Sequence, residues 1–507
     1  MGLNLASIIT DTAAETPEAV AVRLGPLELT YGELDDRSAR LATLLREHGL
    51  AQGDRVGVML PNVLEFPVSY YGVLRAGGVV VPMNVLLKRR EIAFYLEDSG
   101  AELLLAWHGF AAEARDGAAD AGAELIEVEP EAFAELLGDR APDADLADTG
   151  EEDTAVILYT SGTTGKPKGA ELTHFNLSRN SDISARTTSN VEAGDVVLGA
   201  LPLFHSFGQT VSMNASLRVG ATLTLLPKFD PGEALEIMQR DRVTHFYGVP
   251  TMYGALLHHP ERERYDTSAL RICITGGASM PVEVLRGFEQ AFGCEVLEGY
   301  GLSETSPVAC TNHPGRPRKA GSIGTPLEEV EMKVVDEDDA EVAQGEVGEI
   351  VIRGHNVMKG YWQRPEATEE AMRGGWFHSG DMARVDEDGY FFIVDRKKDL
   401  IIRGGYNVYP REVEEVLYEH PKIREAAVVG VPHDDWGEEI GAAVVLHEGE
   451  ELAPQEVSEY VKERIAAYKY PRIVWFLEEL PKGPTGKILK REIEVPAPAD
   501  SAGHPQV

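Results

Sequence analysis

The feature of this sequence that most limits its fold is the alternation of helix-like and strand-like segments within residues 1–110. Residues 30–49 (TYGELDDRSARLATLLREHG) predict an amphipathic helix that begins with a capping box at Thr30 and Glu33 and ends at Gly49. The following segments predict in turn a buried strand (RVGVML), a helix (LEFPVSYYGVLRAGG) and a second strand (VVVPMN). This order is typical of βαβ units, so we expect a parallel sheet covered by helices.

Strand-like segments recur further along the chain and then change in character. They continue as AVILYT, ATLTLLP, THFYGVP, LRICITGG and CEVLEGYG. From about residue 330, glycines and acidic turns bound the segments EMKVVD, GEIVIRG and GYFFIVD, which is typical of antiparallel strands. After residue 398, the helix-like segments YPREVEEVLYEHP and PQEVSEYVKERIAAY surround the strand-like segments EAAVVGVP and GAAVVLHE.

We therefore expect an α/β protein with two domains and a tail. The large N-terminal domain, residues 1–397, is expected to contain parallel-rich sheets with helices plus a small antiparallel β part. Residues 398–495 are expected to form a small α+β C-terminal domain. The tail, residues 496–507, is rich in proline and alanine and is expected to be disordered.

Charge and cysteine content argue against several classes of protein. The 507 residues include 47 lysines and arginines against 84 aspartates and glutamates, which gives a net charge of −37. This excess disfavours binding to nucleic acid or anionic lipid, because both are polyanions. Cys273, Cys294 and Cys310 are odd in number and form no CxxC pair, so neither a disulfide framework nor a structural zinc site is indicated.

The sequence shows no targeting or membrane segment. Its N-terminus, MGLNLASIIT, has no basic region followed by a long apolar run, and no apolar stretch reaches the ~18 residues that span a membrane. We therefore expect a cytoplasmic protein with no nucleic-acid partner.

A glycine-rich loop, YTSGTTGKPKG at residues 159–169, follows the apolar run AVIL. Small residues let the backbone approach a ligand, and successive N–H groups form an anion-binding concavity, so polyphosphate is the expected ligand. The loop is not a Walker A sequence, because only two residues separate Gly162 from Gly165 and because Pro167 follows Lys166. A flexible surface turn is the alternative.

Further motifs follow this loop in the order PLFHSFG, GYGLSETSP, WFHSGDMA, DRKKDLIIRGGYNVYPREVE and PTGKILKRE. With these motifs, over about residues 10–492, the sequence resembles the adenylate-forming superfamily of acyl-CoA synthetases, luciferases and peptide-synthetase adenylation domains. It is most similar to bacterial medium- to long-chain fatty acyl-CoA synthetases. The resemblance implies a ligase that uses ATP and Mg²⁺ to convert a carboxylic acid to an acyl-adenylate and pyrophosphate. It then forms acyl-CoA, with coenzyme A (CoA) as co-substrate, and AMP.

The resemblance implies a nucleotide site assembled from several motifs. Tyr300 would stack on adenine, and Asp381 would accept hydrogen bonds from the ribose hydroxyls beside Arg396. Glu304 would bind Mg²⁺, which prefers a carboxylate or two together with phosphates and waters. Thr160 would be a further metal contact. The glycine-rich loop would close over the β- and γ-phosphates with Thr160, Ser161, Gly162, Thr163, Thr164, Gly165, Lys166 and Lys168. Other nucleotide contacts would come from Gly277, Ala278, Gly301 and Thr305.

The same resemblance assigns roles to the C-terminal domain, which would be mobile. Lys487 would be the catalytic lysine, because an ammonium group between the carboxylate and the α-phosphate offsets their repulsion. The domain would rotate between the two half-reactions about a hinge at Lys398, after which Gly404 and Gly405 would leave room beside the CoA thiol. Some relatives carry a lysine just after the hinge that serves the second half-reaction, but Ile402 stands there.

The acyl pocket is expected between residues 202–208 and 246–257, with Gly248 in its wall. His205 would act catalytically as a gate between the acyl and CoA tunnels; a packed structural histidine is the alternative. No arginine is obviously placed for a second carboxylate, and the NxYGPTE wording of amino-acid adenylation domains is absent. We therefore expect a monocarboxylic fatty acid as the substrate. Aryl or cinnamic acids are the alternative substrate, and an acyl carrier protein is the alternative acceptor. The oligomeric state, monomer or homodimer, stays open.

Overall fold

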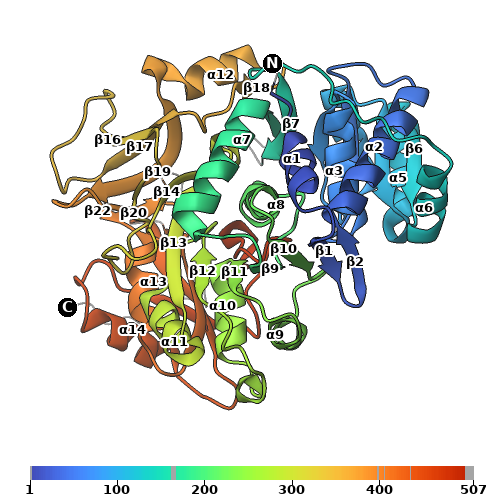
Figure 1. Cartoon of the computed structure of the whole chain (residues 1–507). Coiled ribbons are helices and arrows are strands. Elements are labelled where there is room, and N and C mark those ends of the chain that lie inside the picture. Colours follow the sequence, from blue (N-terminus) through green and yellow to red (C-terminus); the bar gives the residue numbers. More distant parts are fainter. Residues whose placement is uncertain (1–2, 161–166, 397–398, 405, 434–435, 497–507) are drawn as a thin grey trace.

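The computed structural model describes residues 3–160, 167–396, 399–404, 406–433 and 436–496. These residues form two large mixed sheets, an antiparallel sheet and a separate C-terminal unit (Figure 1). The expected α/β fold class, with parallel-rich sheets and an antiparallel part, is confirmed. Within the described ranges, no helix has both the length and the apolar character needed to cross a membrane.

The first large sheet is built from the alternating segments near the N-terminus. Its seven strands are, in order of neighbours, β18 (Gly360–Tyr361), β8 (Lys168–Thr173), β7 (Thr154–Thr160), β4 (Val79–Pro82), β3 (Arg55–Met59), β5 (Leu103–Trp107) and β6 (Glu124–Val128). The strands from β7 to β6 are parallel, as predicted, whereas β8 and β18 add antiparallel strands at one edge.

The helices of this region are α1 (Ser7–Glu15), α2 (Tyr31–Glu47), α3 (Glu65–Arg75), α4 (Arg89–Ser99), α5 (Ala111–Ala121) and α6 (Pro130–Gly138). The predicted capping box is present in α2: the Thr30 side chain accepts from the Glu33 backbone, and the Glu33 side chain accepts from the Thr30 backbone. The buried face of α2 includes Leu34, Leu41 and Leu44. The periodic leucines and the cap therefore fixed this helix as the sequence predicted.

The second large sheet has nine strands, in the order β15 (Thr325–Pro326), β14 (Val308–Thr311), β13 (Glu295–Gly301), β12 (Ile272–Thr275), β11 (His245–Gly248), β9 (Val196–Gly199), β10 (Thr222–Leu225), β1 (Val20–Leu24) and β2 (Leu27–Thr30). The strands from β13 to β1 are parallel, and antiparallel strands complete both edges. Its helices are α9 (Pro231–Arg240), α10 (Pro250–Leu257) and α11 (Val282–Phe292).

Between the two large sheets lie α7 (His174–Ile183), α8 (Ala215–Arg218) and the π-helical segments η2 (Ser184–Ser189) and η3 (Gly208–Asn214). The helix α7 contacts β8 of the first sheet, and α8 contacts β10 of the second (Figure 1). One hydrophobic cluster includes side chains from both sheets and from these central helices. The two sheets therefore share a core.

The antiparallel sheet consists of β16 (Val330–Val335), β17 (Gly348–Gly354), β19 (Phe377–Val385) and β20 (Phe391–Arg396), with α12 (Pro365–Ala371) nearby. The sequence predicted β16, β17 and β20 but not β19. The motif FHSGDMA within β19 mixes polar residues with Gly380 at φ 73°, which conceals its alternation.

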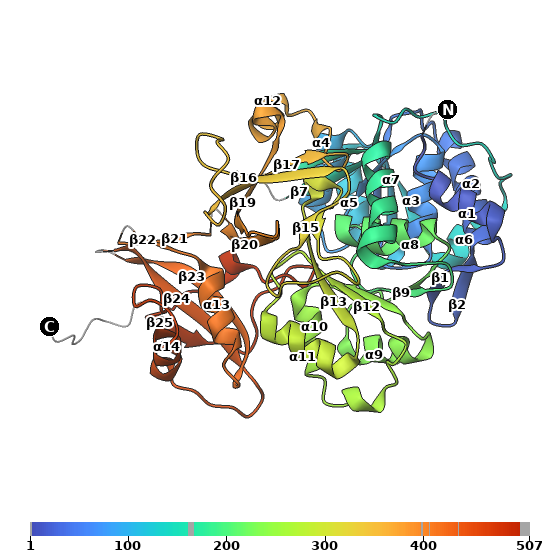
Figure 2. The ribbon, with the colours of Figure 1, turned by 60° about the vertical axis from the view of Figure 1, so that its left-hand side comes forward.

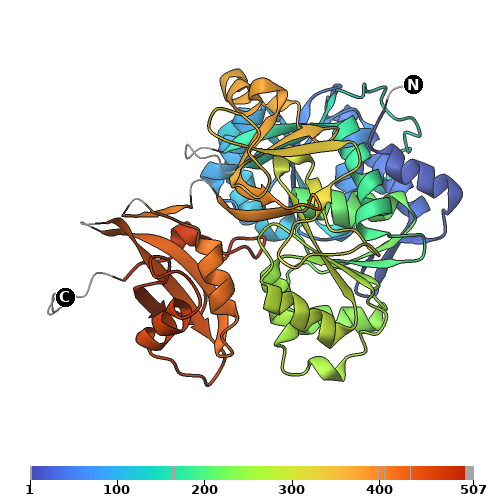
Figure 3. The same cartoon turned by 90° about the vertical axis from the view of Figure 1, so that its left-hand side faces the viewer.

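The C-terminal unit contains β21 (Ile401–Arg403), β22 (Tyr406–Val408), α13 (Pro410–Tyr418), β23 (Ile423–His433), β24 (Gly437–Leu446), α14 (Pro454–Lys462) and β25 (Ile473–Phe476). It lies beside the rest of the chain in Figures 2 and 3. Its two hydrophobic clusters include only residues from Ile401 onward. Helix α14 ends at Lys462, before the end of the helix-like segment 454–468.

Candidate active site

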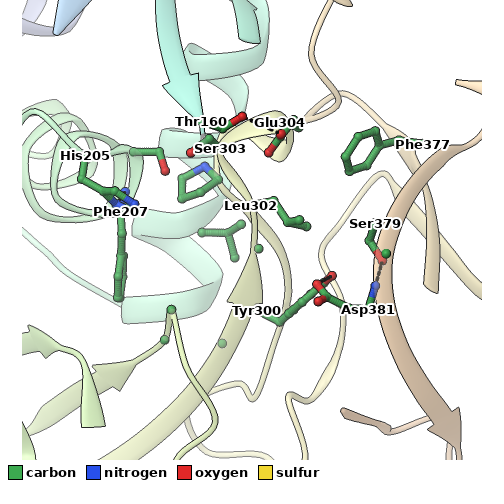
Figure 4. A pocket seen from close by; sticks show the side chains of 18 of the residues that line it. Thr160, His205, Phe207, Tyr300, Leu302, Ser303, Glu304, Phe377, Ser379 and Asp381 are labelled. Carbon is green, nitrogen blue, oxygen red and sulfur yellow. Dashed lines mark hydrogen bonds between the residues drawn. The ribbon is translucent and has the colours of Figure 1, made fainter. Parts of the chain in front are cut away.

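A cavity of about 790 Å³ opens beside the carboxyl ends of strands from both large sheets. Ligands of open α/β sheets bind outside such strand ends. The ends of β7, β12 and β13 contribute to this cavity, β19 and β20 line another side, and a loop of the C-terminal unit reaches into it. Representative lining residues from these elements are Thr160, Gly276, Tyr300, Asp381, Arg396 and Lys487. Figure 4 shows Thr160, Tyr300 and Asp381 around the cavity.

The glycine-rich loop meets this cavity at both of its described ends. Thr160 is the last residue of β7 and Lys168 is the first residue of β8, and both line the cavity. The ammonium of Lys168 lies 5.1 Å from the centre of the Tyr361 ring, a cation–π distance. The predicted loop members Ser161, Gly162, Thr163, Thr164, Gly165 and Lys166 lie outside the described residues.

Glu304 lies at the centre of a small polar cluster. It sits on the short 3-10 turn η5 (Ser303–Thr305), and it is largely buried at 9% exposure. Its Oε1 accepts hydrogen bonds from the Tyr361 hydroxyl at 2.9 Å and from the Thr160 hydroxyl at 3.3 Å. Burial and the neighbouring Glu304 carboxylate raise the pKa of Tyr361, so its hydroxyl stays a donor. The cluster supplies hard oxygen atoms of the kind that Mg²⁺ prefers, so it could hold this ion.

Tyr300, Asp381 and Arg396 form a second polar group in the cavity lining. Tyr300 and Asp381 lie across the cavity from His205 and Phe207 (Figure 4). The Tyr300 hydroxyl donates to Asp381 Oδ2 at 2.6 Å, and Arg396 Nε lies 3.3 Å from Asp381 Oδ1. Burial, and then the Asp381 charge, raise the pKa of Tyr300 well above its ordinary value. The three side chains that the sequence assigned to adenosine are therefore adjacent.

The small residues predicted near the nucleotide differ in their placement. Gly277 and Gly301 line the cavity, and a Cβ on Gly301 would lie 1.8 Å from the Pro307 carbonyl oxygen, so only glycine fits. Ala278 lines a neighbouring cavity instead. Thr305 is fully buried, and its hydroxyl donates to the carbonyl of Pro307 at 2.5 Å. It is not among the residues lining the first cavity, so its phosphate contact stays a prediction.

Lys487 reaches the cavity from a tight turn of the C-terminal unit. The Gly483 N–H donates to the Lys487 carbonyl at 2.8 Å, and Lys482 forms a β-bridge with Ile488. The Lys487 side chain lines the cavity together with Thr160 and His205. Burial, and then the ammonium of Lys487, lower the pKa of His205 to about 4, so the imidazole is neutral at pH 7.

Part of the cavity lining is apolar. This apolar wall comprises Leu201, Phe207, Val211, Val249, Ile274, Leu302 and Val308. Gly276 also belongs to this wall, because a Cβ there would lie 3.3 Å from the Phe207 ring and 3.2 Å from the Gly299 carbonyl oxygen. The expectation for Gly248 is wrong. A Cβ on Gly248 would meet the rings of Phe246 and Tyr253, and Gly248 is not a lining residue.

A second cavity, of about 680 Å³, separates the start of α10 and residues 277–281 from the C-terminal unit. Glu298 lines it at 3% exposure; its Oε1 accepts from the Met280 N–H at 3.1 Å, while Oε2 has no hydrogen-bond partner in the described ranges. Burial raises the pKa of Glu298 to about 7, although Arg411 opposes this. Gly404 is exposed and lines neither cavity, and Lys398 and Gly405 lie outside the described residues.

Sequence reasoning missed Tyr361, which lines the cavity, and Thr251, which contacts the turn that carries Lys487. Tyr361 binds Glu304 from the two-residue strand β18, which is too short to show a strand pattern. Thr251 donates from α10 to the Gly486 carbonyl at 2.7 Å, next to Lys487. A threonine in the predicted segment 246–257 carried no signal for a contact 235 positions away.

Comparison with known proteins identifies the family. The model of the AMP-binding enzyme family matches residues 9–362, and that of the AMP-binding enzyme C-terminal domain matches residues 412–487. A long-chain-fatty-acid–CoA ligase of Bacillus subtilis is 40% identical over an alignment of 531 residues, covering 97% of this chain and 94% of that protein. A feruloyl-CoA synthase of an Amycolatopsis species is 41% identical over 482 residues, covering 95% and 96% of the two chains.

A solved structure agrees in fold over nearly the whole chain. The crystal structure of ATP-bound MatB from Rhodopseudomonas palustris superimposes with a TM-score of 0.91 at 34% sequence identity, covering 97% of this chain and 98% of that one. The chain therefore belongs to the AMP-binding enzymes of the adenylate-forming superfamily, and it is an ATP-dependent, AMP-forming acid–thiol ligase of the acyl-CoA synthetase type.

Proposed function

We propose that this enzyme activates a fatty acid with ATP and Mg²⁺ and transfers the acyl group to CoA. The observation that carries the proposal is that Lys487, the polar cluster around Glu304 and an apolar wall meet in one cavity. An acid with its chain along the apolar wall would place its carboxylate between His205 and the phosphate-binding edge. The relative from Bacillus subtilis supports the same acid class.

In the first half-reaction, the carboxylate attacks the α-phosphate and pyrophosphate leaves. Both reactants are anionic, so the Lys487 ammonium would hold them together and stabilise the developing charge. Asp381 and Arg396 would fix the ribose, and Tyr300 would pack on adenine. Glu304, with Thr160, would hold Mg²⁺, which supplies charge neutralisation on the phosphates. Lys168 adds a positive charge at the same edge.

In the second half-reaction, the CoA thiol attacks the acyl carbonyl and AMP leaves. Lys487 occupies the cavity while Gly404, in the same C-terminal unit, lines neither cavity. We infer that this arrangement serves adenylation and that residues 398–495 rotate against residues 1–397 about Lys398 before thioester formation. His205, which is neutral at pH 7 in the adenylation arrangement, would then flank the path of the thiol.

A hydroxylated aryl acid is the second candidate, and it rests on a different observation. Thr188 and Ser206 are among the residues that line the cavity, each is 1% exposed, and their buried hydroxyls have no hydrogen-bond partner within the described ranges. A buried hydroxyl without a partner costs about 1–3 kcal/mol, and an apolar acyl chain would leave both hydroxyls in that state. A ring hydroxyl could satisfy them, and the feruloyl-CoA synthase relative accords with this.

A substrate panel separates these functions. Saturated acids of increasing length and hydroxylated cinnamic acids should each be assayed with ATP for pyrophosphate release, and with CoA or an acyl carrier protein for thioester. For a fatty-acid ligase, kcat/KM should rise by roughly fourfold per methylene, as about 0.8 kcal/mol of burial implies, until the pocket is filled. A higher kcat/KM for the hydroxycinnamic acids than for any fatty acid would reject the fatty-acid assignment. If thioester forms with the carrier protein and none forms with CoA, the assignment of CoA as the acceptor is wrong.

A further inference from the structure

The turn that presents Lys487 is joined to the large part of the chain at the start of α10. The Thr251 hydroxyl donates a hydrogen bond to the carbonyl oxygen of Gly486, at 2.7 Å. Thr251 belongs to the first turn of α10, after Pro250, so its backbone is held by the helix. Gly486 directly precedes Lys487. A single hydrogen bond therefore connects a rigid helix to the residue beside the proposed catalytic lysine.

The turn also lies very close to this helix. Gly486 has φ +80°, a conformation that favours glycine. A Cβ on Gly486 would lie 3.0 Å from Val249 Cγ2 and 3.2 Å from Thr251 Oγ1. Glycine at this position thus permits both the turn and the close approach. The hydrogen bond and the close approach both show that the Lys487 turn packs directly against residues 249–251, which we call the seat of the turn.

Thr251 itself is not in the reaction cavity. It lines the second cavity, between α10 and the C-terminal unit, whereas Lys487 lines both. The Thr251 hydroxyl bonds to the turn, so we expect its effect on the reacting groups to act through the turn. A displacement of about 1 Å can reduce the rate of an oriented reaction by roughly a hundredfold, so the position of the turn matters for the lysine.

We propose that Thr251 is a positioning residue for adenylation, whose hydroxyl seats the Gly486–Lys487 turn so that the lysine ammonium reaches the carboxylate and α-phosphate. This inference rests on the proposed role of Lys487. Because the proposed rotation carries Lys487 away from the cavity, it also breaks the Thr251–Gly486 bond. Thr251 should therefore support the first half-reaction and not the second.

The test compares Thr251→Val, which removes the donor at nearly constant volume, with Thr251→Ser, which keeps it. Adenylation, followed by pyrophosphate exchange, should fall roughly three- to tenfold in the valine variant, the range for one net hydrogen bond. The serine variant should stay close to wild type. Thioester formation from supplied acyl-adenylate and CoA should be unchanged in both. Thr267→Val is the matched control, because Thr267 lines neither cavity.

A double-mutant cycle shows whether Thr251 acts through the lysine. In a Lys487→Ala background, Thr251→Val should cause no further loss of adenylation, because the group that it positions is gone. An equal fold-loss in both backgrounds would overturn the proposal. So would equal loss of both half-reactions, a serine variant as slow as the valine variant, or full adenylation by the valine variant.

Two further measurements keep the outcome unambiguous. If Thr251→Val does not fold, Gly486→Ala tests the same seat, because its Cβ would displace the turn, and its adenylation should fall while thioester formation persists. Lys487→Ala distinguishes an error in the role of Lys487 from an error in the role of Thr251. If that variant is strongly slowed in adenylation and Thr251→Val is fully active, only the positioning role is wrong. If Lys487→Ala adenylates normally, the proposed function of Lys487 is wrong and the inference falls with it.

Discussion

The magnesium role proposed for Glu304 can be tested by exchanging one oxygen for an amide, in Glu304→Gln. The Oε1 atom accepts from Tyr361 at 2.9 Å and from Thr160 at 3.3 Å, and the glutamine carbonyl can keep both bonds. The fold should therefore survive. The neutral amide is a poorer ligand for Mg²⁺ than a carboxylate. Removal of one preorganised electrostatic contact costs about 3–4 kcal/mol, so we expect adenylation to fall roughly 10²–10³-fold.

The assay is pyrophosphate exchange across a magnesium titration. The variant should require more magnesium for half-maximal rate and should stay slow at saturation. Glu102→Gln is the matched control, because Glu102 is an exposed glutamate that lines neither cavity. Circular dichroism and the thermal unfolding midpoint confirm folding. A folded Glu304→Gln enzyme with the wild-type rate at low magnesium would remove this carboxylate from the metal site.

Three further predictions concern the lysine, the acyl wall and a buried acid. Lys487→Ala should lose roughly 10²–10³ in adenylation but make thioester at the wild-type rate from supplied acyl-adenylate; equal loss of both steps would contradict the assignment. Gly276→Val should shift the preferred fatty acid to shorter chains, because its side chain would enter the space beside Phe207; an unchanged length profile in a folded variant would move the wall elsewhere. Glu298→Gln should gain stability relative to wild type as pH rises from about 4.3 to 7 in denaturant titrations. The folded enzyme keeps Glu298 protonated in this window while the unfolded chain ionises it, so a flat difference would refute the raised pKa.

Much of the fold could be predicted from local sequence signals. The elements that the sequence analysis missed are short or irregular. The βαβ pattern, the Thr30–Glu33 cap and the change to antiparallel strands near residue 330 agree with the structure. The strand β18 has two residues, and β19 contains Gly380 at φ 73°, so neither carries a clear alternation. Helix α14 ends at Lys462 although the helix-like pattern extends beyond it. Most helical stability in proteins comes from tertiary packing, which a local pattern does not show.

In the candidate site, too, residues in local motifs were predictable, whereas contacts between distant segments were not. Ordered motifs located Thr160, Glu304 and Lys487, which the structure brings to one cavity. The face of a strand on which a single residue lies was not predictable from the sequence. Gly248 was expected in the wall, yet the backbone of β11 turns it toward Phe246 and Tyr253. Partners such as Tyr361 depend on a strand pairing formed far along the chain, which no local pattern specifies.

The pair Asp381–Arg396 has a consequence for how the two steps are timed. Arg396 is separated by one residue from the proposed pivot at Lys398, and its side chain lies 3.3 Å from the carboxylate proposed to hold the ribose. Adenosine is common to ATP, to the acyl-adenylate and to AMP, so this pair meets the same chemical group at every stage. It can anchor the nucleotide next to the pivot, but it cannot distinguish an unreacted from a reacted molecule. The information that the first step is complete must come from the other end of the nucleotide, where departure of pyrophosphate changes the charge facing Thr160, Lys168 and Glu304.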